Sequence, residues 1–256
     1  MFEYENVRIA WLGHDAFRIE AATENRKVVY VDPFKIEAGG AKADIVLITH
    51  EHFDHCSIDD LRKIVTANTV LVAHAQSKNE LSKLRARELK IIKPGDRLEV
   101  GGLTIRAVPA YNLNKFREPG VVFHKKEDGK LGFLITVNGV QIYHAGDTDN
   151  IPEMKQLHPD IALLPVSGTY VMTPQEAADA ARMLKPRIVI PMHYGTIVGG
   201  LPDAETFERL TDCRVVILPR EETKAPSFVV SPTRKNIEAR ISCPEIISYM
   251  KLSLYG

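Results

Sequence analysis

Short apolar runs rich in Val and Ile recur along the chain, each bounded by Gly, Pro or Asp. Runs of this length and composition predict β-strands. The predicted strands are Val7–Leu12, Ala16–Glu20, Val28–Asp32, Ile45–Thr49, Val70–His74, Leu103–Val108, Gly132–Val137, Val140–His144, Ile161–Leu164, Ile188–Pro191 and Val215–Leu218.

Helix start signals lie between some of these strands. A Ser, Thr or Asp ahead of an apolar periodic stretch is typical of a helix N-cap, and a Glu three residues later completes a capping box. Pro at the first helical position strengthens the signal. The predicted starts are Ser57 ahead of Ile58–Val65, Ser77 ahead of Glu80, Thr173 ahead of Pro174 and Glu176, and Asp203 after Pro202.

The strand pattern of the first half is repeated in the second. Three runs between residues 28 and 74 correspond in order to three runs between residues 140 and 193, and the third run of each set leads to a histidine, His74 or His193. Strands and helices alternate too regularly for an all-β sandwich. We therefore expect an α/β fold of two mixed sheets packed face to face, with helices outside and an approximate twofold axis.

Composition narrows the class of protein. The chain has 256 residues, 45% of them apolar and 26% charged, which is enough for a sizeable core. Lys plus Arg and Asp plus Glu both number 33, so the formal net charge is zero and a broadly basic nucleic-acid surface is not expected. No apolar run is long enough to span a membrane, and we expect a cytoplasmic protein. The three cysteines lie far apart, so neither a disulfide framework nor a cysteine zinc site is expected.

The most specific chemical signal is T-H-E-H-F-D-H, residues 49–55, where an apolar strand runs into a loop. His50 and His52 alternate and so point the same way in extended backbone, and Asp54 and His55 follow as the chain turns. Imidazole and carboxylate suit Zn, Mn or Fe ions. This spacing predicts one pair of ligands for each of two neighbouring metal ions.

Four residues cannot complete two metal sites, so further ligands must come from other strand ends. Asp147 and His193 both end apolar strands of the second half, where side chains of an open α/β sheet meet the ligand crevice. We expect Asp147 to bridge the two ions and His193 to complete the site that Asp54 and His55 begin.

These residues resemble the metallo-β-lactamase superfamily, whose pattern is H-x-H-x-D-H, a later His, an Asp after Gly and a final His. The resemblance covers roughly residues 8–218 and implies a four-layer αβ/βα sandwich with the metals at one sheet edge. It also implies that His50, His52, Asp54, His55, Asp147 and His193 are metal ligands. Four motifs point to the branch of ascorbate-6-phosphate lactonase-like proteins and N-acyl phosphatidylethanolamine phospholipase D: L-G-H-D-A-F (12–17), V-D-P-F (31–34), A-G-D-T (145–148) and M-H-Y-G (192–195).

One position departs from the family pattern. Where the family places a third histidine of the first site, this chain has V-P-A-Y-N, which ends at Asn112. Either that site has three protein ligands and water, or His124 reaches it from the following loop. We assign Asp54 and His124 catalytic roles and assign His14 and Asn112 to substrate binding. Asp32 is expected to accept a hydrogen bond from a ligand histidine.

Two other histidines are expected to be structural. His144 stands three residues before Asp147 on a strand, so alternation directs it to the opposite face. His74 ends a strand in the first half, and its pseudo-symmetry with His193 is the one reason to keep it as a candidate ligand.

The site and the resemblance together predict a metal-dependent hydrolase. Two divalent ions, Zn in the first place with Mn or Fe as alternatives, would share a water and supply hydroxide that cleaves a phosphodiester, a lactone or a related small ester. The alternatives are a metal-dependent nuclease and a non-catalytic metal-binding module. We expect a small-molecule substrate rather than nucleic acid.

The last residues have no counterpart in either half. We expect a hydrolase domain over residues 1–220 and a C-terminal extension over residues 221–256 that caps the domain, contacts a second subunit in a homo-oligomer or frays.

Overall fold

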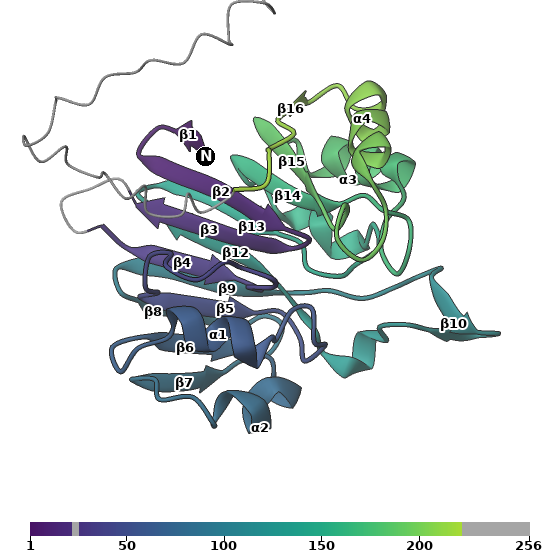
Figure 1. Ribbon diagram of the computed structural model, residues 1–256. Helices are drawn as coiled ribbons and strands as arrows, with labels where there is room; N and C mark the ends of the chain where they lie inside the picture. The colour runs from purple at the N-terminus through teal and green to yellow at the C-terminus, as the bar shows by residue number, and fades with distance from the viewer. Residues whose placement is uncertain (22–25, 222–256) are drawn as a thin grey trace, which may run out of the picture. The chain divides into compact units, whose positions relative to one another are not determined.

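The computed structural model describes residues 1–21 and 26–221, and within them the strands form two seven-stranded sheets and one two-stranded hairpin (Figure 1). The first sheet contains β1 (Phe2–Tyr4), β2 (Val7–Gly13), β3 (Ala16–Ala21), β4 (Val28–Val31), β5 (Ile45–Ile48), β6 (Val70–Ala73) and β7 (Glu88–Ile91). The second contains β8 (Arg97–Val100), β9 (Leu103–Pro109), β12 (Leu131–Val137), β13 (Val140–His144), β14 (Ile161–Pro165), β15 (Ile188–Met192) and β16 (Arg214–Val215). The hairpin is β10 (Phe116–Glu118) and β11 (Val121–Val122).

The two sheets have the same topology. The first runs β1 to β7 in order, with antiparallel pairs up to β4 and parallel pairs from β4 to β7. The second runs β8, β9, β12, β13, β14, β15, β16, antiparallel up to β13 and parallel from β13 to β16. The internal repeat and the expected pair of mixed sheets are therefore confirmed.

Successive side chains along the central strands of the first sheet point to opposite faces, and both faces are buried. Val29 and Val31 of β4 lie in the central core between the two sheets, together with Phe133 and Ile135 of β12. Their neighbours Val28 and Tyr30 point the other way, into a second apolar layer. The strands β4 and β5 are buried on both faces and apolar throughout, so they show no polar alternation.

Helices cover the outer faces. They are α1 (Ile58–Ile64), α2 (Lys78–Leu81), α3 (Pro174–Leu184) and α4 (Leu201–Leu210), with short 3-10 helices at Ala75–Ser77, Lys126–Asp128 and Pro152–Gln156. In α1, Leu61 and Ile64 pack on the second apolar layer of the first sheet. The helices α3 and α4 lie against β14 and β15 of the second sheet (Figure 1).

Three of the four predicted helix starts are confirmed, because α1, α2 and α3 begin directly after Ser57, Ser77 and Thr173. Ser57 caps α1 by accepting from the backbone of Asp60, and Thr173 and Glu176 form the expected capping box of α3. Ser77 makes no capping hydrogen bond from its side chain. The prediction at Asp203 was placed too late, because α4 begins after Gly200 and Asp203 instead accepts the Gly200 amide at 2.8 Å.

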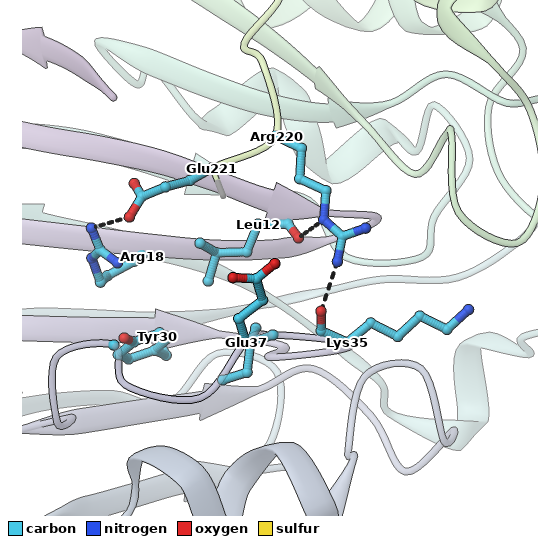
Figure 2. Close-up of a pocket in the computed structure, with 9 residues that line it drawn as sticks. Leu12, Arg18, Tyr30, Lys35, Glu37, Arg220 and Glu221 are labelled. Carbon is cyan, nitrogen blue, oxygen red and sulfur yellow. Dashed lines mark hydrogen bonds and ion pairs between the residues drawn. The ribbon is translucent and has the colours of Figure 1, made fainter. Parts of the chain in front are cut away.

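The turn between β2 and β3 is held from the far end of the described chain (Figure 2). Arg220 donates to the carbonyl oxygens of Leu12 and Lys35 at 2.9 and 2.7 Å. Glu221 accepts from Arg18 at 2.7 Å and donates its amide to the Trp11 carbonyl. These bonds anchor the hairpin whose tip carries His14 and Asp15.

Of the predicted C-terminal extension, only Glu221 belongs to the described residues, and residues 222–256 lie outside them. None of the helices in the described part of the chain is both long and apolar enough to cross a membrane.

Candidate metal centre

The chemical side chains gather at one edge of the two sheets, beyond the carboxyl ends of parallel strands. Asp32 follows β4, the segment 49–55 follows β5, Asp147 follows β13, and His193 follows β15. Parallel strands of an open α/β sheet deliver ligand-binding loops at this edge. The internal repeat places the corresponding edges of both sheets beside each other, so residues far apart in sequence meet there.

One group of side chains, the first cluster, consists of His50, His52 and His124. One nitrogen from each lies within 4.8 Å of the others, and the Nε2 of His50 is 3.0 Å from the Nδ1 of His52. His50 and His124 are buried, while His52 is exposed. The structure thus joins His124, not Asn112, to the two histidines of the motif.

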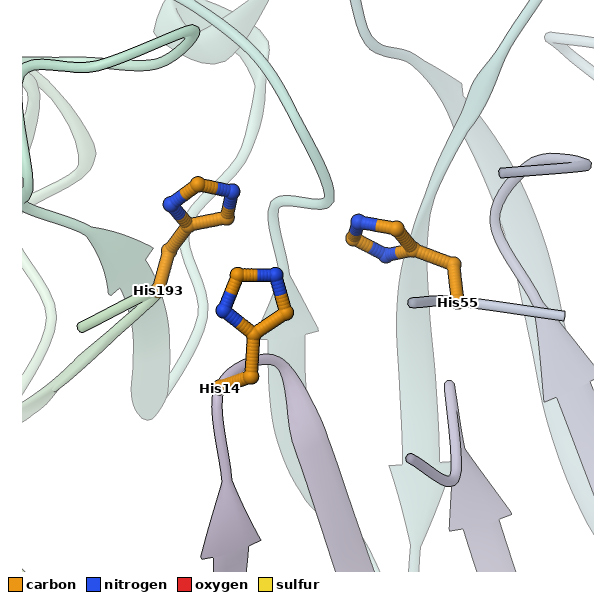
Figure 3. Close-up of side chains that lie close together, drawn as sticks. All are labelled: His14, His55 and His193. Carbon is orange, nitrogen blue, oxygen red and sulfur yellow. The ribbon is translucent and has the colours of Figure 1, made fainter. Parts of the chain in front are cut away.

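A second group, the second cluster, consists of Asp15, His55, Asp147 and His193, whose ligand atoms also lie within 4.8 Å of one another. All four are buried. His14 points from the β2–β3 turn between His55 and His193 (Figure 3), and its ring lies 4.2 Å from that of His193.

Asp147 lies between the two clusters. Its Oδ1 is 3.4 Å from the Nε2 atoms of both His55 and His193, and its Oδ2 is 3.9 Å from the Nε2 of His50. The preceding Gly146 has a φ of +64°, and a Cβ there would lie 2.5 Å from the carbonyl oxygen of Leu131. Only glycine fits this close approach of two backbones, which fixes where Asp147 emerges.

Asp54 sits beside the second cluster and is paired with His14. The Nε2 of His14 is 3.1 Å from Asp54 Oδ2, which is 3.8 Å from His55 Nε2. Burial works against charge on Asp54, but the hydrogen bond with His14 and the nearby His55 outweigh it and lower its pKa to about 2. Asp54 is therefore an anion across the neutral range.

The environment keeps the first cluster neutral. Burial lowers the pKa of His50 well below its usual value, and it lowers that of His124 to about 4. The pKa of His52 is also lowered, by burial and by the nearby Lys130. Neutral imidazole is the form that binds a metal ion.

The second cluster attracts positive charge. Burial opposes charge on His55, but the carboxylates of Asp147 and Asp32 outweigh it and raise its pKa well above the usual value. Burial likewise opposes charge on Asp147, whose pKa is nevertheless held far down by His55 and His193. In the absence of another cation, protons on these imidazoles balance the carboxylates.

The residues present fit a metal centre. Several buried polar atoms have no hydrogen-bond partner among the described residues: His14 Nδ1, both carboxylate oxygens of Asp15, His55 Nε2 and Asp147 Oδ1. Buried polar atoms are almost always satisfied, so a concentration of such atoms without hydrogen-bond partners in a single place is what a ligand-binding centre requires. The donors are imidazole nitrogens and carboxylate oxygens, which suit Zn, Mn or Fe.

The clusters open into a cavity of about 330 Å³. Its polar lining comes from His52, Asp54, His124 and Asp147. The remaining lining residues are apolar or aromatic: Phe53, Phe123, Tyr170 and Ile197. A bound molecule would therefore touch both clusters from one side.

Comparison with known families decides the classification. The sequence pattern of the Beta-lactamase superfamily domain matches residues 8–193. The chain belongs to the metallo-β-lactamase superfamily. It is 35% identical over 231 residues to a UPF0173 metal-dependent hydrolase of Thermoplasma acidophilum, covering 85% of this chain and 97% of the relative. A UPF0173 metal-dependent hydrolase of Methanoculleus marisnigri is 33% identical, with 85% and 96% covered.

Solved structures agree with this placement. A candidate metal-dependent hydrolase of Parabacteroides distasonis is 32% identical, with a TM-score of 0.69 and coverage of 83% of this chain and 94% of that one. A metallo hydrolase of Ignicoccus hospitalis, 24% identical, has a TM-score of 0.66 over 84% and 96% of the two chains, which shows the shared fold. This chain thus belongs with the UPF0173 metal-dependent hydrolases and has the metallo-β-lactamase fold, as the sequence predicted at the level of the superfamily.

Other hydrogen bonds fix the ring orientation of two histidines in this hydrolase. Asp32 Oδ2 accepts from His55 Nδ1 at 2.8 Å and also from the Thr49 hydroxyl. Ser167 lies 2.9 Å from His193 Nδ1 and donates its own proton to the carbonyl of Thr169. In both cases the Nε2 atom is left free to face the site.

Asn112 has a different place from the one expected. Its Nδ2 donates to the Tyr170 carbonyl at 2.8 Å and to Asp149, and its Oδ1 accepts the His124 amide at 2.9 Å. The side chain is buried, and its donor and acceptor are both engaged within the protein. Asn112 therefore holds the loop that carries His124.

Two buried residues escaped the sequence analysis. Asp15 is adjacent to His14 in the motif L-G-H-D-A-F, yet a turn aspartate gives no distinguishing signal by itself. Lys130 is buried, with its Nζ 3.2 Å from Glu51 Oε1 and 3.4 Å from His52 Nε2. Nothing in its sequence context marks it.

The two histidines expected to be structural lie outside both clusters. His144 Nε2 is 2.9 Å from the Asp15 carbonyl, and His144 Nδ1 accepts the Gly146 amide. His74 Nε2 is 3.0 Å from the carbonyl of Asp128. Both rings are held by backbone groups.

Proposed function

We propose that this hydrolase cleaves a phosphodiester, a lactone or a related small ester at a centre of two divalent metal ions. The observation that carries the proposal is the position of Asp147, whose two carboxylate oxygens face different clusters. A carboxylate so placed is suited to bridging two cations. The resemblance of four sequence motifs to the ascorbate-6-phosphate lactonase-like and phospholipase D branch supports the substrate range.

His50, His52 and His124 would hold one ion, and His55, Asp147 and His193 the other. Asp54 would serve the second ion as well, given its place beside His55. We add Asp15 as a further donor, because it is buried and both of its carboxylate oxygens lack a partner within the described chain. Zinc suits the first cluster, which consists of imidazoles alone, whereas the second cluster with its two carboxylates also suits Mn or Fe.

The ions supply Lewis acidity, which makes water more acidic and polarises the oxygen of the bond to be broken. Asp54 stays ionised at neutral pH and so is in the form that accepts a proton or a hydrogen bond from the attacking water. His14 holds that carboxylate through its 3.1 Å contact. Asn112 fixes the backbone of His124.

A small molecule fits the cavity better than a nucleic acid does. None of the described residues that line it carries a cationic side chain other than histidine. Phosphate backbones are held mainly by Lys and Arg, and strong binding needs several such contacts. The formal net charge of zero agrees with this.

The test is hydrolysis by the full-length protein loaded with Zn, Mn or Fe. Bis-p-nitrophenyl phosphate, γ-butyrolactone and single-stranded RNA separate the candidate substrate classes. We expect turnover of the phosphodiester or the lactone, loss of turnover after chelation and in Asp147→Asn, and recovery when metal is restored. Absence of turnover with every metal, while the protein stays folded, would contradict the proposal.

A further inference from the structure

The cavity at the metal centre has, besides its polar lining, an apolar lining that hydrolysis itself does not require. Four side chains make this apolar lining, here called the apolar wall: Phe53, Phe123, Tyr170 and Ile197. They come from four separate loops, which follow β5, β11, β14 and β15. The chain thus brings one apolar residue from each of four segments to the mouth of one site.

Several of these side chains are exposed to a degree that folding does not explain. Phe53 is 70% exposed, Ile197 41% and Tyr170 40%. A single exposed apolar residue is ordinary on a protein surface. A group of them converging on a cavity with polar residues at its floor is typical of a ligand-binding site.

The wall is held in place before any ligand binds. The ring of Phe123 meets that of Tyr170 edge to face, with centroids 4.6 Å apart. Phe53 meets the buried Phe34 in the same way at 5.8 Å. Edge-to-face pairs of this kind restrain ring orientation, so a bound group gains contact without first ordering the wall.

The apolar wall has no cationic side chain that could pair with an anionic group of a bound substrate. Its four residues carry no ionisable cation. Three lysines of the segment that brings Phe123 and His124 are already paired, Lys115 with Glu176 at 2.7 Å, Lys126 with Glu153 at 2.7 Å and Lys130 with Glu51 at 3.2 Å, and the fourth, Lys125, does not line the cavity. An anion extending from the centre along the wall would lose hydration and gain no partner.

We propose that the substrate is a neutral carboxylic ester or lactone whose acyl part carries an apolar chain or ring, and that this part lies on the apolar wall. The inference rests on the proposed hydrolase function and names the substrate class of the same site. The volume of about 330 Å³ lies at the small end of the range for ligand pockets, roughly 300–1,000 Å³, so the acyl part is short.

The experiment compares p-nitrophenyl acetate, butyrate and hexanoate with bis-p-nitrophenyl phosphate and methyl p-nitrophenyl phosphate. The full-length, metal-loaded protein is used, and chelated protein gives the background. We expect kcat/KM to rise along the ester series by up to about fourfold for each methylene that the wall buries. We also expect the esters to exceed the phosphodiesters in kcat/KM.

Wall variants supply the second readout. Ile197→Ser and Phe53→Ser should lower the ratio of kcat/KM for hexanoate to that for acetate, while the metal content measured by mass spectrometry stays at the wild-type value. Leu201→Ser is the matched control, because Leu201 is 51% exposed but does not line the cavity. It should leave the ratio unchanged.

Different failures have different meanings. Ester hydrolysis with no dependence on chain length, a preference for the phosphodiesters, or wall variants with the wild-type ratio would overturn the substrate class and leave the hydrolase centre standing. Absence of metal-dependent hydrolysis of every ester, every phosphodiester and γ-butyrolactone would overturn the proposed function, and this inference with it.

Discussion

At the scale of single residues, the centre depends on which atoms of each side chain remain free. Asp32 and Ser167 engage the Nδ1 atoms of His55 and His193, so each Nε2 faces the site. His144 has both ring nitrogens engaged by backbone groups. Burial alone therefore does not distinguish a ligand histidine from a structural one, whereas the hydrogen-bond partners do.

This distinction predicts opposite outcomes for two buried histidines. His124→Ala removes one of three donors in the first cluster, so we expect the protein to lose about one metal ion per chain and most of its activity. His144→Ala should keep both ions, although the loss of packing and hydrogen bonds will lower its stability. Mass spectrometry of metal content on folded samples measures both, and a His144→Ala protein that is folded but metal-free would overturn the assignment.

Asp15 gives a second prediction at this scale. Asp15→Asn keeps the shape of the side chain and removes its charge, so the second ion should bind about 10- to 100-fold more weakly. Competition with a chromophoric chelator measures that affinity. Asp44→Asn is the control, because Asp44 precedes β5 at the end of that strand opposite the site, where its carboxylate accepts the Val28 amide. An unchanged affinity in Asp15→Asn would show that Asp15 is not a donor.

At the scale of elements, the ends of β13 and β12 determine where Asp147 lies. The backbones approach so closely that a Cβ on Gly146 would meet the Leu131 carbonyl oxygen. The motif A-G-D-T thus has a physical explanation. The absence of a side chain on Gly146 lets the backbone of β12 approach closely, and this fixes the position of Asp147 between the clusters.

Gly146→Ala should therefore destabilise the fold and weaken metal binding together. Gly139→Ala is a close control, because Gly139 has a φ of +83° and a Cβ added there would meet no atom of the described residues within 4 Å. We expect Gly139→Ala to cost about 1 kcal/mol from the positive φ alone and Gly146→Ala about 2 kcal/mol more. Urea titration measures both, and equal costs would contradict the close-approach explanation.

The start of α3 is coupled to the loop that leads to His124. Glu176 accepts from the Thr173 amide at 2.8 Å and also from Lys115 and Asn114. Partial burial opposes charge on Glu176, but the hydrogen bonds from Lys115 and the Thr173 backbone outweigh it and lower its pKa to about 2. A lowered pKa in the folded state means that the ionised form stabilises the protein.

The pH dependence of that contribution follows in sign. The stabilisation is present above the unfolded pKa of Glu, about 4.3, and is lost as the pH falls towards about 2. We expect Glu176→Gln to cost about 1 kcal/mol at pH 7, since the site is partly exposed. Urea titrations of both proteins at several pH values should show this difference shrinking below pH about 4. A difference independent of pH would contradict it.

Sequence and structure agree most closely where burial is strongest. The runs that became β4, β5, β14 and β15 are apolar on both faces, so the sequence shows them without tertiary information. The edge strands β7 and β8 were missed, because their exposed residues include Glu88 and Arg97 and resemble loop. Edge strands commonly carry charged side chains, because charges keep an unpaired edge from pairing with another chain.

The site was predictable in part for a related reason. The residues of the motif at 49–55 lie close together in sequence, so their spacing revealed them. The choice between Asn112 and His124 depends on the path of the loop that contains β10 and β11, and that path is set by contacts such as Lys115 with Glu176. Asp15 meets His193 only through the packing of the two sheets, which no local pattern encodes.

At the scale of the whole molecule, the centre joins the two halves of the internal repeat. The first cluster combines His50 and His52 of the first half with His124, and the second combines Asp15 and His55 with Asp147 and His193. Cations bound between them would stabilise the assembled fold relative to the unfolded chain, where the donors are dispersed.

Metal removal should therefore lower thermal stability. With free metal at about 1,000 times its dissociation constant, linkage predicts about 4 kcal/mol of stabilisation, or roughly 10 °C in Tm for a domain of this size. Calorimetry before and after chelation measures the shift, and return of the metal should restore it. A melting temperature unaffected by chelation would contradict a centre that joins the halves.

The most direct test of the central claim is an anomalous difference map from crystals of the metal-loaded protein. We predict two peaks. One should lie within about 2.0–2.3 Å of nitrogens from His50, His52 and His124, and the other within that distance of His55, His193 and Asp147. No peak at either cluster in a loaded, folded protein, or a single ion bound elsewhere on the chain, would contradict the account.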